Sequence, residues 1–222
     1  MQIITTSDGS HTLFSEQFNE IYHSRHGAIQ ESQHVFIKNG FDYLLQQGVT
    51  ELSIFEVGFG TGLNAWLTLM EAAKAGLPVT YHTIELYPVS IDLIKELNYP
   101  ALIENEKYRP PFHSMHLCTW DEEHEITPFF KFKKINASLL NYTLPIANCQ
   151  LIYFDAFAPE HQPEMWTAEI MQKMYDILQP GGTLVSYCSK SLFQRALKQA
   201  GFSIEKLPGP PGKREMVRAI KV

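Results

Sequence analysis

The chain has 222 residues, of which 45% are hydrophobic and 19% are charged, so it can bury the apolar core of a globular protein. It contains no run approaching the ~18 apolar residues of a membrane span, and its first residues lack the basic and apolar segments of a secretory signal. The formal net charge of −6 argues against nonspecific binding of nucleic acid over the whole surface.

Length and cysteine content favour one domain in a reducing compartment. A length prior of about 100–200 residues per domain predicts a single domain at 1–222, with an N-terminal extension and first helix at 1–48 and a core at 49–222. The three cysteines, an odd number without a C-x-x-C pair, are a poor framework for disulfides. We therefore expect a cytoplasmic protein.

The charge is distributed unevenly along the chain. Residues 190–222 contain eight basic and two acidic residues, a net charge of +6, which leaves −12 for the rest of the chain. A second basic cluster consists of Lys131, Lys133 and Lys134. Such asymmetry indicates either a face for a polyanion or a solvated charged surface, and both interpretations stay open.

Apolar periodicity and turn residues predict the elements in chain order. The first thirty residues are polar and rich in turns. Helices are predicted at 31–47, before Gly48, and at 64–75, 90–97, 164–178 and 192–200. Strands are predicted at 52–57, 79–86, 135–140, 151–154, 183–187, 202–207 and 215–222, while most of 98–134 stays unassigned.

Strands that alternate with helices predict an α/β, Rossmann-like fold with a mostly parallel sheet. The last two predicted strands are separated only by the loop 208–214, whereas a parallel pair needs a crossover of about a dozen residues or more. We therefore expect the sheet to end in an antiparallel hairpin.

A glycine-rich turn follows the strand at 52–57 and precedes the helix at 64–75. Its glycines, Gly58, Gly60 and Gly62, allow positive φ and a close approach of a ligand to the backbone. The dinucleotide pattern G-x-G-x-x-G requires glycine where this chain has Leu63, and here Glu56 precedes the glycines. A carboxylate at that place suits the cationic amino-acid group of S-adenosylmethionine. The segment E-x-G-x-G-x-G and the terminal hairpin resemble class I methyltransferases; a turn that only connects strand and helix is the alternative.

Glu85 ends the second strand of this arrangement, where an acid commonly accepts hydrogen bonds from ribose hydroxyls; a surface carboxylate is the alternative. Gly58, Glu85 and Asp155 all fall at the ends of predicted strands. Ligands of open α/β sheets bind at the carboxyl ends of strands. The sequence therefore predicts a ligand site across these three strand ends.

Asp155 closes the apolar strand at 151–154 and begins the segment Asp155-Ala-Phe-Ala-Pro159. Methyl transfer is a displacement at a sulfonium methyl, in which the enzyme mainly orients the acceptor. An amine must be neutral to attack, and a carboxylate can accept its hydrogen bond and help remove its proton. Because an ionised carboxylate also favours the protonated amine, Asp155 is predicted to act chiefly by positioning. Phe157 and Trp166 are either core aromatics or surfaces on which a base stacks.

Four segments resemble, in order and spacing, the methyltransferase domain of the MnmC-type tRNA wobble-uridine enzymes. They are EVGFGTGLN, YFDAFAPEHQPEMWT, PGGTLVSY and GKREM. Tyr22-His-Ser24, Gly27 and Glu31-Ser-Gln-His-Val-Phe36 resemble that family's opening signature, so the match extends from about Tyr22 to the C-terminus. The family methylates the exocyclic amine of 5-aminomethyl-uridine-type nucleotides at the tRNA wobble position. The resemblance therefore implies S-adenosylmethionine as cofactor and tRNA as partner.

The resemblance also implies roles for individual residues. Asp155 would lie between cofactor and substrate amine as the catalytic residue. Cofactor contacts are implied for Glu56, Gly58, Gly60, Gly62, Asn64 and Glu85. Substrate contacts are implied for Tyr22, Glu31, Phe157, Pro159, Lys213 and Arg214, the last two through RNA phosphates.

The chain departs from the family pattern in three respects. Many members carry a fused FAD-dependent oxidase domain, for which this sequence has no second glycine fingerprint, so another enzyme would supply the aminomethyl substrate. The acid that contacts adenine after the third strand is absent, so Ser138 or Asn136 would replace it. The acidic net charge weakens the RNA assignment more than the methyltransferase assignment.

Other functions stay open at the level of sequence. The acceptor is alternatively a small amine or a protein, and a noncatalytic subunit that binds S-adenosylmethionine is a further hypothesis. A nicotinamide oxidoreductase is disfavoured by Leu63 and by the terminal hairpin. No metal is expected, because His113-x-x-His116 has no accompanying Cys, Asp or Glu pattern.

Overall fold

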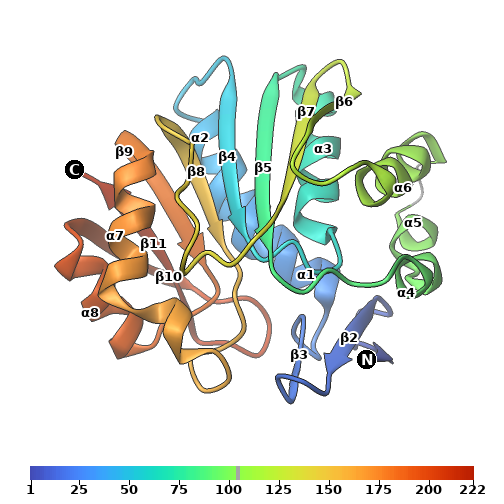
Figure 1. Cartoon of the computed structure of the whole chain (residues 1–222), viewed down its shortest axis with the longest axis horizontal. Helices are drawn as coiled ribbons and strands as arrows, with labels where there is room; N and C mark the ends of the chain where they lie inside the picture. Colours follow the sequence, from blue (N-terminus) through green and yellow to red (C-terminus); the bar gives the residue numbers. More distant parts are fainter. Residues whose placement is uncertain (104–105) are drawn as a thin grey trace.

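An eight-stranded sheet forms the centre of the computed structural model, which describes residues 1–103 and 106–222. The strand order is β10-β11-β9-β8-β4-β5-β7-β6 (Figure 1). The parallel part consists of β4 (Leu52–Val57), β5 (Val79–Glu85), β7 (Phe130–Asn136), β8 (Cys149–Phe154) and β9 (Leu178–Ser186). The antiparallel pairings at the two edges involve β6 (Glu123–Thr127), β10 (Phe202–Pro208) and β11 (Glu215–Lys221).

The predicted α/β fold with a terminal antiparallel hairpin is confirmed. Strand β10 pairs antiparallel with β11 along its whole length, and β11 pairs antiparallel with β9. Side chains of β4 alternate between two core clusters, with Ile54 in one and Phe55 in the other. Because both faces of this strand are buried, its sequence is a nearly continuous apolar run.

Helices cover both faces of the sheet (Figure 1). One face carries α1 (Ala28–Ser32), the π-helix η1 (Gln33–Phe41), α2 (Asp42–Leu45), α3 (Leu63–Ala75), α4 (Ile91–Glu96), α5 (Tyr99–Leu102), the short η2 (Glu106–Tyr108) and α6 (Arg109–Leu117). The other face carries η3 (Pro163–Trp166), α7 (Ala168–Ile177) and α8 (Ser191–Gln199).

Several predicted boundaries were wrong. The first helix begins at Ala28 rather than near Glu31, and it continues through η1 to Leu45. The helix predicted at 164–178 is divided at Thr167, whose side chain accepts a hydrogen bond from the backbone of Ile170 and so caps α7. Strand β9 begins at Leu178, five residues before the predicted strand, and includes the Pro180-Gly-Gly182 segment.

The strand predicted at 135–140 was misplaced, because β7 runs from Phe130 to Asn136. Its first residues alternate buried Phe130 and Phe132 with lysines, a pattern that lies within the stretch left unassigned. Lys134 then breaks the alternation: it is 1% exposed, donates to the carbonyl of His116 at 2.8 Å and lies 4.6 Å from the ring centroid of Trp120. Lys134 therefore contributes neither to a polyanion face nor to a solvated charged surface.

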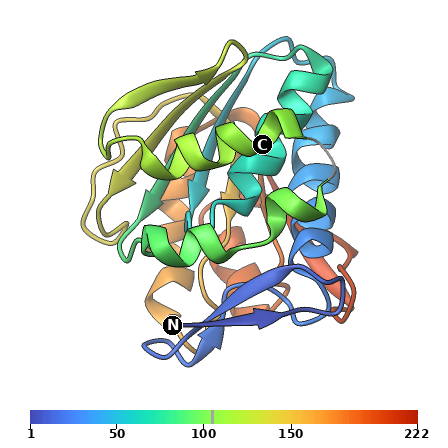
Figure 2. The same ribbon diagram turned by 90° about the vertical axis from the view of Figure 1, so that its right-hand side faces the viewer.

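The turn-rich N-terminus contains a separate three-stranded sheet that the sequence did not indicate. It consists of β1 (Gln2–Thr5), β2 (His11–Ser15) and β3 (Glu20–Ile21). In both views this sheet lies at one end of the molecule, below α4 and α5 in Figure 2. Asn98 joins it to the main body, since its amide accepts from His11 N and donates to the carbonyl of Gly9, both at 2.8 Å.

Within residues 1–103 and 106–222, no helix combines the length and apolarity needed to cross a bilayer. The three cysteines are free, and Cys149 and Cys188 are buried.

We predict that Asn98→Ala loosens the N-terminal sheet. The substitution leaves one backbone N–H and one carbonyl without their partner, and we expect the free energy of unfolding to fall by about 1–3 kcal/mol. Chemical denaturation measures this loss, and limited proteolysis should show faster cleavage within residues 1–21. Lys95→Ala is the control, because the exposed pair of Lys95 with Asp92 is expected to contribute less than about 1 kcal/mol. Equal stability of the two variants would contradict the tethering role of Asn98.

Candidate active site

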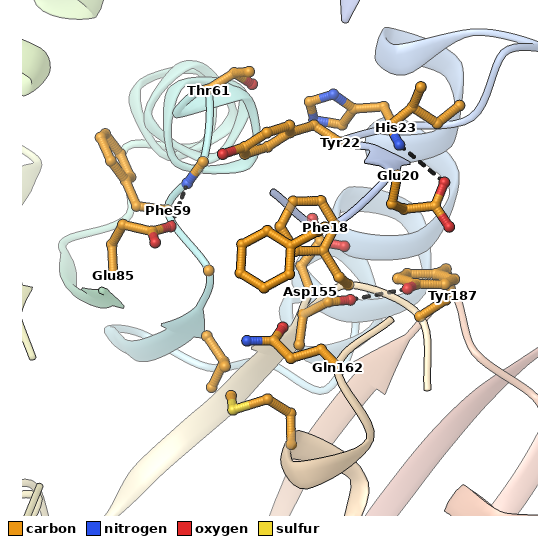
Figure 3. Close-up of a pocket in the computed structure, with 18 of the residues that line it drawn as sticks. Phe18, Glu20, Tyr22, His23, Phe59, Thr61, Glu85, Asp155, Gln162 and Tyr187 are labelled. Atoms are coloured by element: carbon orange, nitrogen blue, oxygen red, sulfur yellow. Dashed lines mark hydrogen bonds between the residues drawn. The ribbon is translucent and has the colours of Figure 1, made fainter. Parts of the chain in front are cut away.

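A cavity of about 590 Å³ opens at the carboxyl ends of the parallel strands (Figure 3). Its volume falls within the range of about 300–1,000 Å³ usual for ligand sites. The loops after β4, β5, β7, β8 and β9 form its floor, and residues of the N-terminal sheet and of the β10–β11 loop complete its walls. Predicted site residues in its lining are Tyr22, Glu31, Gly58, Gly60, Asn64, Glu85, Ser138, Asp155, Phe157 and Lys213.

The glycine-rich turn is shaped by close contacts as well as by its dihedral angles. Gly58 has a φ of +90°, and a Cβ there would lie 2.7 Å from the carbonyl oxygen of Asp155. A Cβ on Gly60 would lie 2.9 Å from the ring of Tyr22. Gly62 instead faces His116, outside the lining, and is the N-cap of α3 in the left-handed region. Gly58 therefore lets the turn lie against the end of β8, and Gly60 leaves room for the ring of Tyr22 in the cavity lining. Gly62 serves the turn into the helix.

Glu85 links the end of β5 to the glycine-rich turn. Its two carboxylate oxygens accept from the backbone N–H groups of Gly60, at 3.1 Å, and of Tyr87, at 2.8 Å. Burial raises the pKa of Glu85 above its ordinary value, and the backbone hydrogen bonds oppose that rise. The carboxylate lines the cavity, so its remaining lone pairs are available to hydroxyl groups of a ligand.

Asp155 is connected through Asn64 to a second carboxyl. The side-chain amide of Asn64 donates to Asp155 Oδ2 at 2.8 Å and to Glu56 Oε1 at 3.2 Å. Glu56 is fully buried and does not line the cavity, so the structure places it behind Asn64 rather than in reach of a ligand. Burial, above all, raises the pKa of Glu56 well above its ordinary value.

Asp155 itself faces the cavity and has an unusual acidity for a carboxyl. Burial and, to a smaller extent, the negative charge of the nearby Glu31 raise its pKa to about 7. The hydrogen bond from Asn64 and the charge of Lys213 act in the opposite direction. A carboxyl with this pKa exchanges its proton near neutral pH, as expected of a group that takes part in proton transfer.

Glu31 and Lys213 form an ion pair on the wall beside Asp155. Lys213 Nζ lies 2.7 Å from Glu31 Oε1, and the other oxygen of Glu31 accepts from Ser24 N at 2.7 Å. The ammonium also lies 3.7 Å from the ring centroid of Tyr187. Lys213 was predicted to contact RNA phosphates; in the structure its charge faces a buried carboxylate and an aromatic ring.

Aromatic side chains line the cavity between Glu85 on one side and Asp155 with its neighbours Glu31 and Lys213 on the other. Phe157 stacks on Phe18, with ring centroids 4.6 Å apart, and meets the edge of Tyr22 at 5.0 Å. In Figure 3, Glu85 and Tyr187 lie on opposite sides, with Phe18 between them in this view. Trp166 is fully buried and donates to the carbonyl of Phe157 at 2.8 Å. Of the two aromatic residues left open by the sequence, Trp166 therefore belongs to the core, whereas Phe157 lines the cavity.

The other predicted residues lie at different distances from the cavity. Ser138 lines the cavity, but Asn136 does not; the side-chain amide of Asn136 donates to the carbonyl of Glu85 at 2.9 Å. Ser138 is therefore the better placed of the two for an adenine ring. Pro159 is buried and Arg214 is exposed, and neither lines the cavity.

The sequence prediction missed Phe18, Gln162 and Tyr187, which all line the cavity. Tyr187 ends a predicted strand beside the one that delivers Asp155, so the rule of strand ends was a usable signal for it. Phe18 lies in a loop of the N-terminal sheet, where no local pattern marks it. Gln162 lies in the loop after β8, within the segment YFDAFAPEHQPEMWT that carries the family resemblance, which was a usable signal for it.

Comparison with known proteins finds relatives in sequence and in structure. The sequence model of a family described as S-adenosyl-L-methionine-dependent methyltransferase matches residues 119–222. The chain is 31% identical over 222 residues to the tRNA 5-methylaminomethyl-2-thiouridine biosynthesis bifunctional protein MnmC of Leptospira interrogans, covering 93% of this chain and 33% of that protein. It is 28% identical to the protein of the same name from Nitrosospira multiformis, with 93% and 35% covered. The chain thus spans about one third of the length of these curated relatives.

A solved structure covers nearly the whole fold. The crystal structure of MnmC2 from Aquifex aeolicus aligns with 98% of this chain and 69% of its own, with a TM-score of 0.79 and 25% sequence identity. The resemblance to the methyltransferase part of MnmC proteins is therefore confirmed, as are the fold class, the enzyme class and S-adenosylmethionine as the cofactor.

We predict that Gly58→Ala weakens cofactor binding. Alanine at positive φ costs about 1–2 kcal/mol, and here its Cβ also meets the backbone oxygen of Asp155, which cannot rotate away. Gly76→Ala is the matched control, because Gly76 also has a positive φ, +63°, but nothing lies within 4 Å of its Cβ position.

Isothermal titration with S-adenosylmethionine and chemical denaturation measure the two effects. We expect Gly76→Ala to lose only stability, and Gly58→Ala to lose more stability and to bind the cofactor about tenfold more weakly, or worse, a difference of at least about 1.4 kcal/mol. Equal affinity in both variants would show that the close approach at Gly58 does not shape the cofactor site.

Proposed function

We propose that this relative of the MnmC methyltransferase part transfers the methyl group of S-adenosylmethionine to the exocyclic amine of a 5-aminomethyluridine-type nucleotide at the tRNA wobble position. The proposal treats residues 1–222 as one methyltransferase unit acting in the cytoplasm. A separate oxidase or another tRNA-modifying enzyme would generate the amine beforehand. The observation that carries the proposal is the place of Asp155, between the glycine-rich turn and a wall of aromatic side chains.

The cavity offers groups that fit this cofactor. Gly58 and Gly60 line the cavity where there is no room for a Cβ, so the turn presents bare backbone to a ligand, and Glu85 presents a carboxylate at the end of β5. The side-chain oxygen of Asn64 is buried without a hydrogen-bond partner, so it can accept from an ammonium group. Ser138 and the neighbouring apolar residues would enclose the adenine ring.

When bound, S-adenosylmethionine supplies a methyl group already activated by a sulfonium, so no protein nucleophile is required. The residues of the chain therefore orient the acceptor and control its proton. Asp155 accepts a hydrogen bond from the amine and takes up the proton that the amine must lose. Asn64 holds the carboxyl in place, and Glu56 fixes Asn64 from behind. An ionised carboxylate would favour the protonated, unreactive amine. With a pKa of about 7, Asp155 is not permanently ionised, so this effect is smaller.

The aromatic wall and the rim suit a nucleotide. Phe157 and Phe18 present ring faces on which an unstacked base can stack, as single-stranded RNA bases do on aromatic side chains. Arg25 and Lys190 line the cavity and are exposed, and Arg214 is exposed nearby on the β10–β11 loop. We assign phosphate contacts to these cations.

A small cationic amine is the second candidate acceptor. The observation that favours it is the number of carboxyl groups in the lining that have no lysine or arginine partner among the residues that the structure describes and can attract a cation of any size: Glu20, Glu85, Asp155 and Glu164.

Methyl transfer from labelled S-adenosylmethionine distinguishes the acceptors. The purified chain is incubated with tRNA that carries 5-aminomethyl-2-thiouridine, with fully modified tRNA, and with simple alkylamines. We expect incorporation only into the first, and nucleoside mass analysis should show one additional methyl group on the wobble nucleoside. Transfer to the free amines alone would favour the second candidate, and transfer to none would contradict both.

We predict that Asp155→Asn lowers turnover by about 10²–10⁴-fold, the usual contribution of acid–base catalysis, with cofactor affinity changed only a few-fold. Asparagine can still accept the hydrogen bond from Asn64, so the fold is preserved. In the unaltered enzyme turnover should fall as the pH drops through about 7, since Asp155 then takes up a proton, and this inflection should disappear in the variant. Glu164→Gln, which removes an exposed carboxyl from the rim, is the control for loss of charge alone. A similar loss in both variants would remove Asp155 from the mechanism.

A further inference from the structure

We propose that the ion pair between the buried Glu31 and the partly exposed Lys213 sets the charge state of Asp155. Glu31 is then a positioning residue rather than a substrate contact, and Lys213 is a positioning residue rather than a contact to RNA phosphate. The inference rests on the proposed function, because it concerns the same carboxyl. It reassigns Lys213, which the sequence associated with the backbone of tRNA.

Both carboxylate oxygens of Glu31 already bind partners within the protein. Glu31 is 6% exposed, and each of its oxygens has a partner at 2.7 Å, one being Ser24 N and the other Lys213 Nζ. Removing a charge from water is costly unless it is paired and hydrogen-bonded. Lys213 therefore neutralises a buried charge, and a phosphate that drew it away would leave Glu31 uncompensated.

Lys213 is also fixed by its surroundings. Its ammonium lies 3.7 Å from the ring centroid of Tyr187, and the hydroxyl of Tyr187 donates to the carbonyl of Ala156 at 2.8 Å. Ala156 is the residue next to Asp155. The preceding Gly212 is packed against His26, whose ring would overlap any Cβ at that position. A polyanion could draw Lys213 outward only by breaking its contacts with Glu31 and Tyr187.

Glu31 and Lys213 act on Asp155 with opposite signs. The negative charge of Glu31 raises the pKa of Asp155, and the positive charge of Lys213 lowers it. The other groups that interact with Asp155 are the Asn64 amide, which stabilises its ionised form, and the buried Glu56, Tyr81 and Tyr187, which interact with its charge. Each partner of the pair is therefore expected to shift the ionisation of Asp155 in its own direction when removed.

Single and double variants test these signs. In Lys213→Met, the uncompensated Glu31 should displace the acid limb of the pH–rate profile to higher pH and reduce turnover at neutral pH several-fold. In Glu31→Gln, the remaining cation should displace the limb to lower pH. The double variant should have a pH–rate profile close to that of the unaltered enzyme. Lys213→Arg, as a single substitution, keeps the positive charge and should also leave the profile close to that of the unaltered enzyme.

Arg214→Met serves as the contrast. Arg214 is exposed and its charge is assigned to phosphate, so its loss should raise KM for tRNA and reduce the slope of binding against salt by about one, without displacing the acid limb. If Lys213→Met behaves in the same way, with an unmoved limb and a reduced salt slope, the proposal is overturned and Lys213 is a phosphate contact.

A second measurement separates this inference from the proposed function. The titration of Asp155 can be followed in the full chain by NMR of carboxyl-labelled aspartate, with Asp155→Asn to assign the signal. Opposite displacements in Lys213→Met and Glu31→Gln would support the inference even if tRNA is not the acceptor. Should Lys213→Met fail to fold, Glu31→Gln and the double variant, which leave no unpaired buried carboxylate, still test it. Identical titration in every folded variant would overturn it.

Discussion

The structure depends on the close approach of two backbones at the centre of the sheet. Strands β4 and β8 are neighbours in register, and Gly58 N and Asp155 N both bond to adjacent strands where these two end. A side chain at position 58 would lie 2.7 Å from the carbonyl oxygen of Asp155. Because position 58 is glycine, the turn after β4 can pack directly against the end of β8, which carries Asp155.

This proximity places a chain of polar groups behind the cavity. Asn64, in the first turn of α3, bonds to Asp155 in front and to Glu56 behind. The same helix begins directly after the glycine-rich turn, so one short segment both shapes the floor and holds the acid. Buried polar groups that are joined in this way keep side chains in one orientation, which is what an enzyme that works mainly by positioning requires.

The ends of the chain complete the site. Glu31 follows the N-terminal sheet and Lys213 precedes the last strand, and they meet across a separation of 182 residues in the sequence. Phe18 and Tyr22 from the same N-terminal segment lie against Phe157. The floor of the cavity thus belongs to the sheet common to class I methyltransferases, whereas the wall beside Asp155 is built by segments outside the parallel strands.

The amino-acid sequence alone determined those features that depend only on residues close together in the chain. The apolar run at 52–57, the glycines after it, the acid after 151–154 and the short final loop each depend on neighbours in the chain, and each was predicted correctly. Only the tertiary structure decided that Lys134 is buried, that Phe18 covers the cavity and that Lys213 faces Glu31. Lysine and phenylalanine suit either surface or interior according to what lies opposite them, and here the opposite groups come from distant segments that meet only in the folded chain.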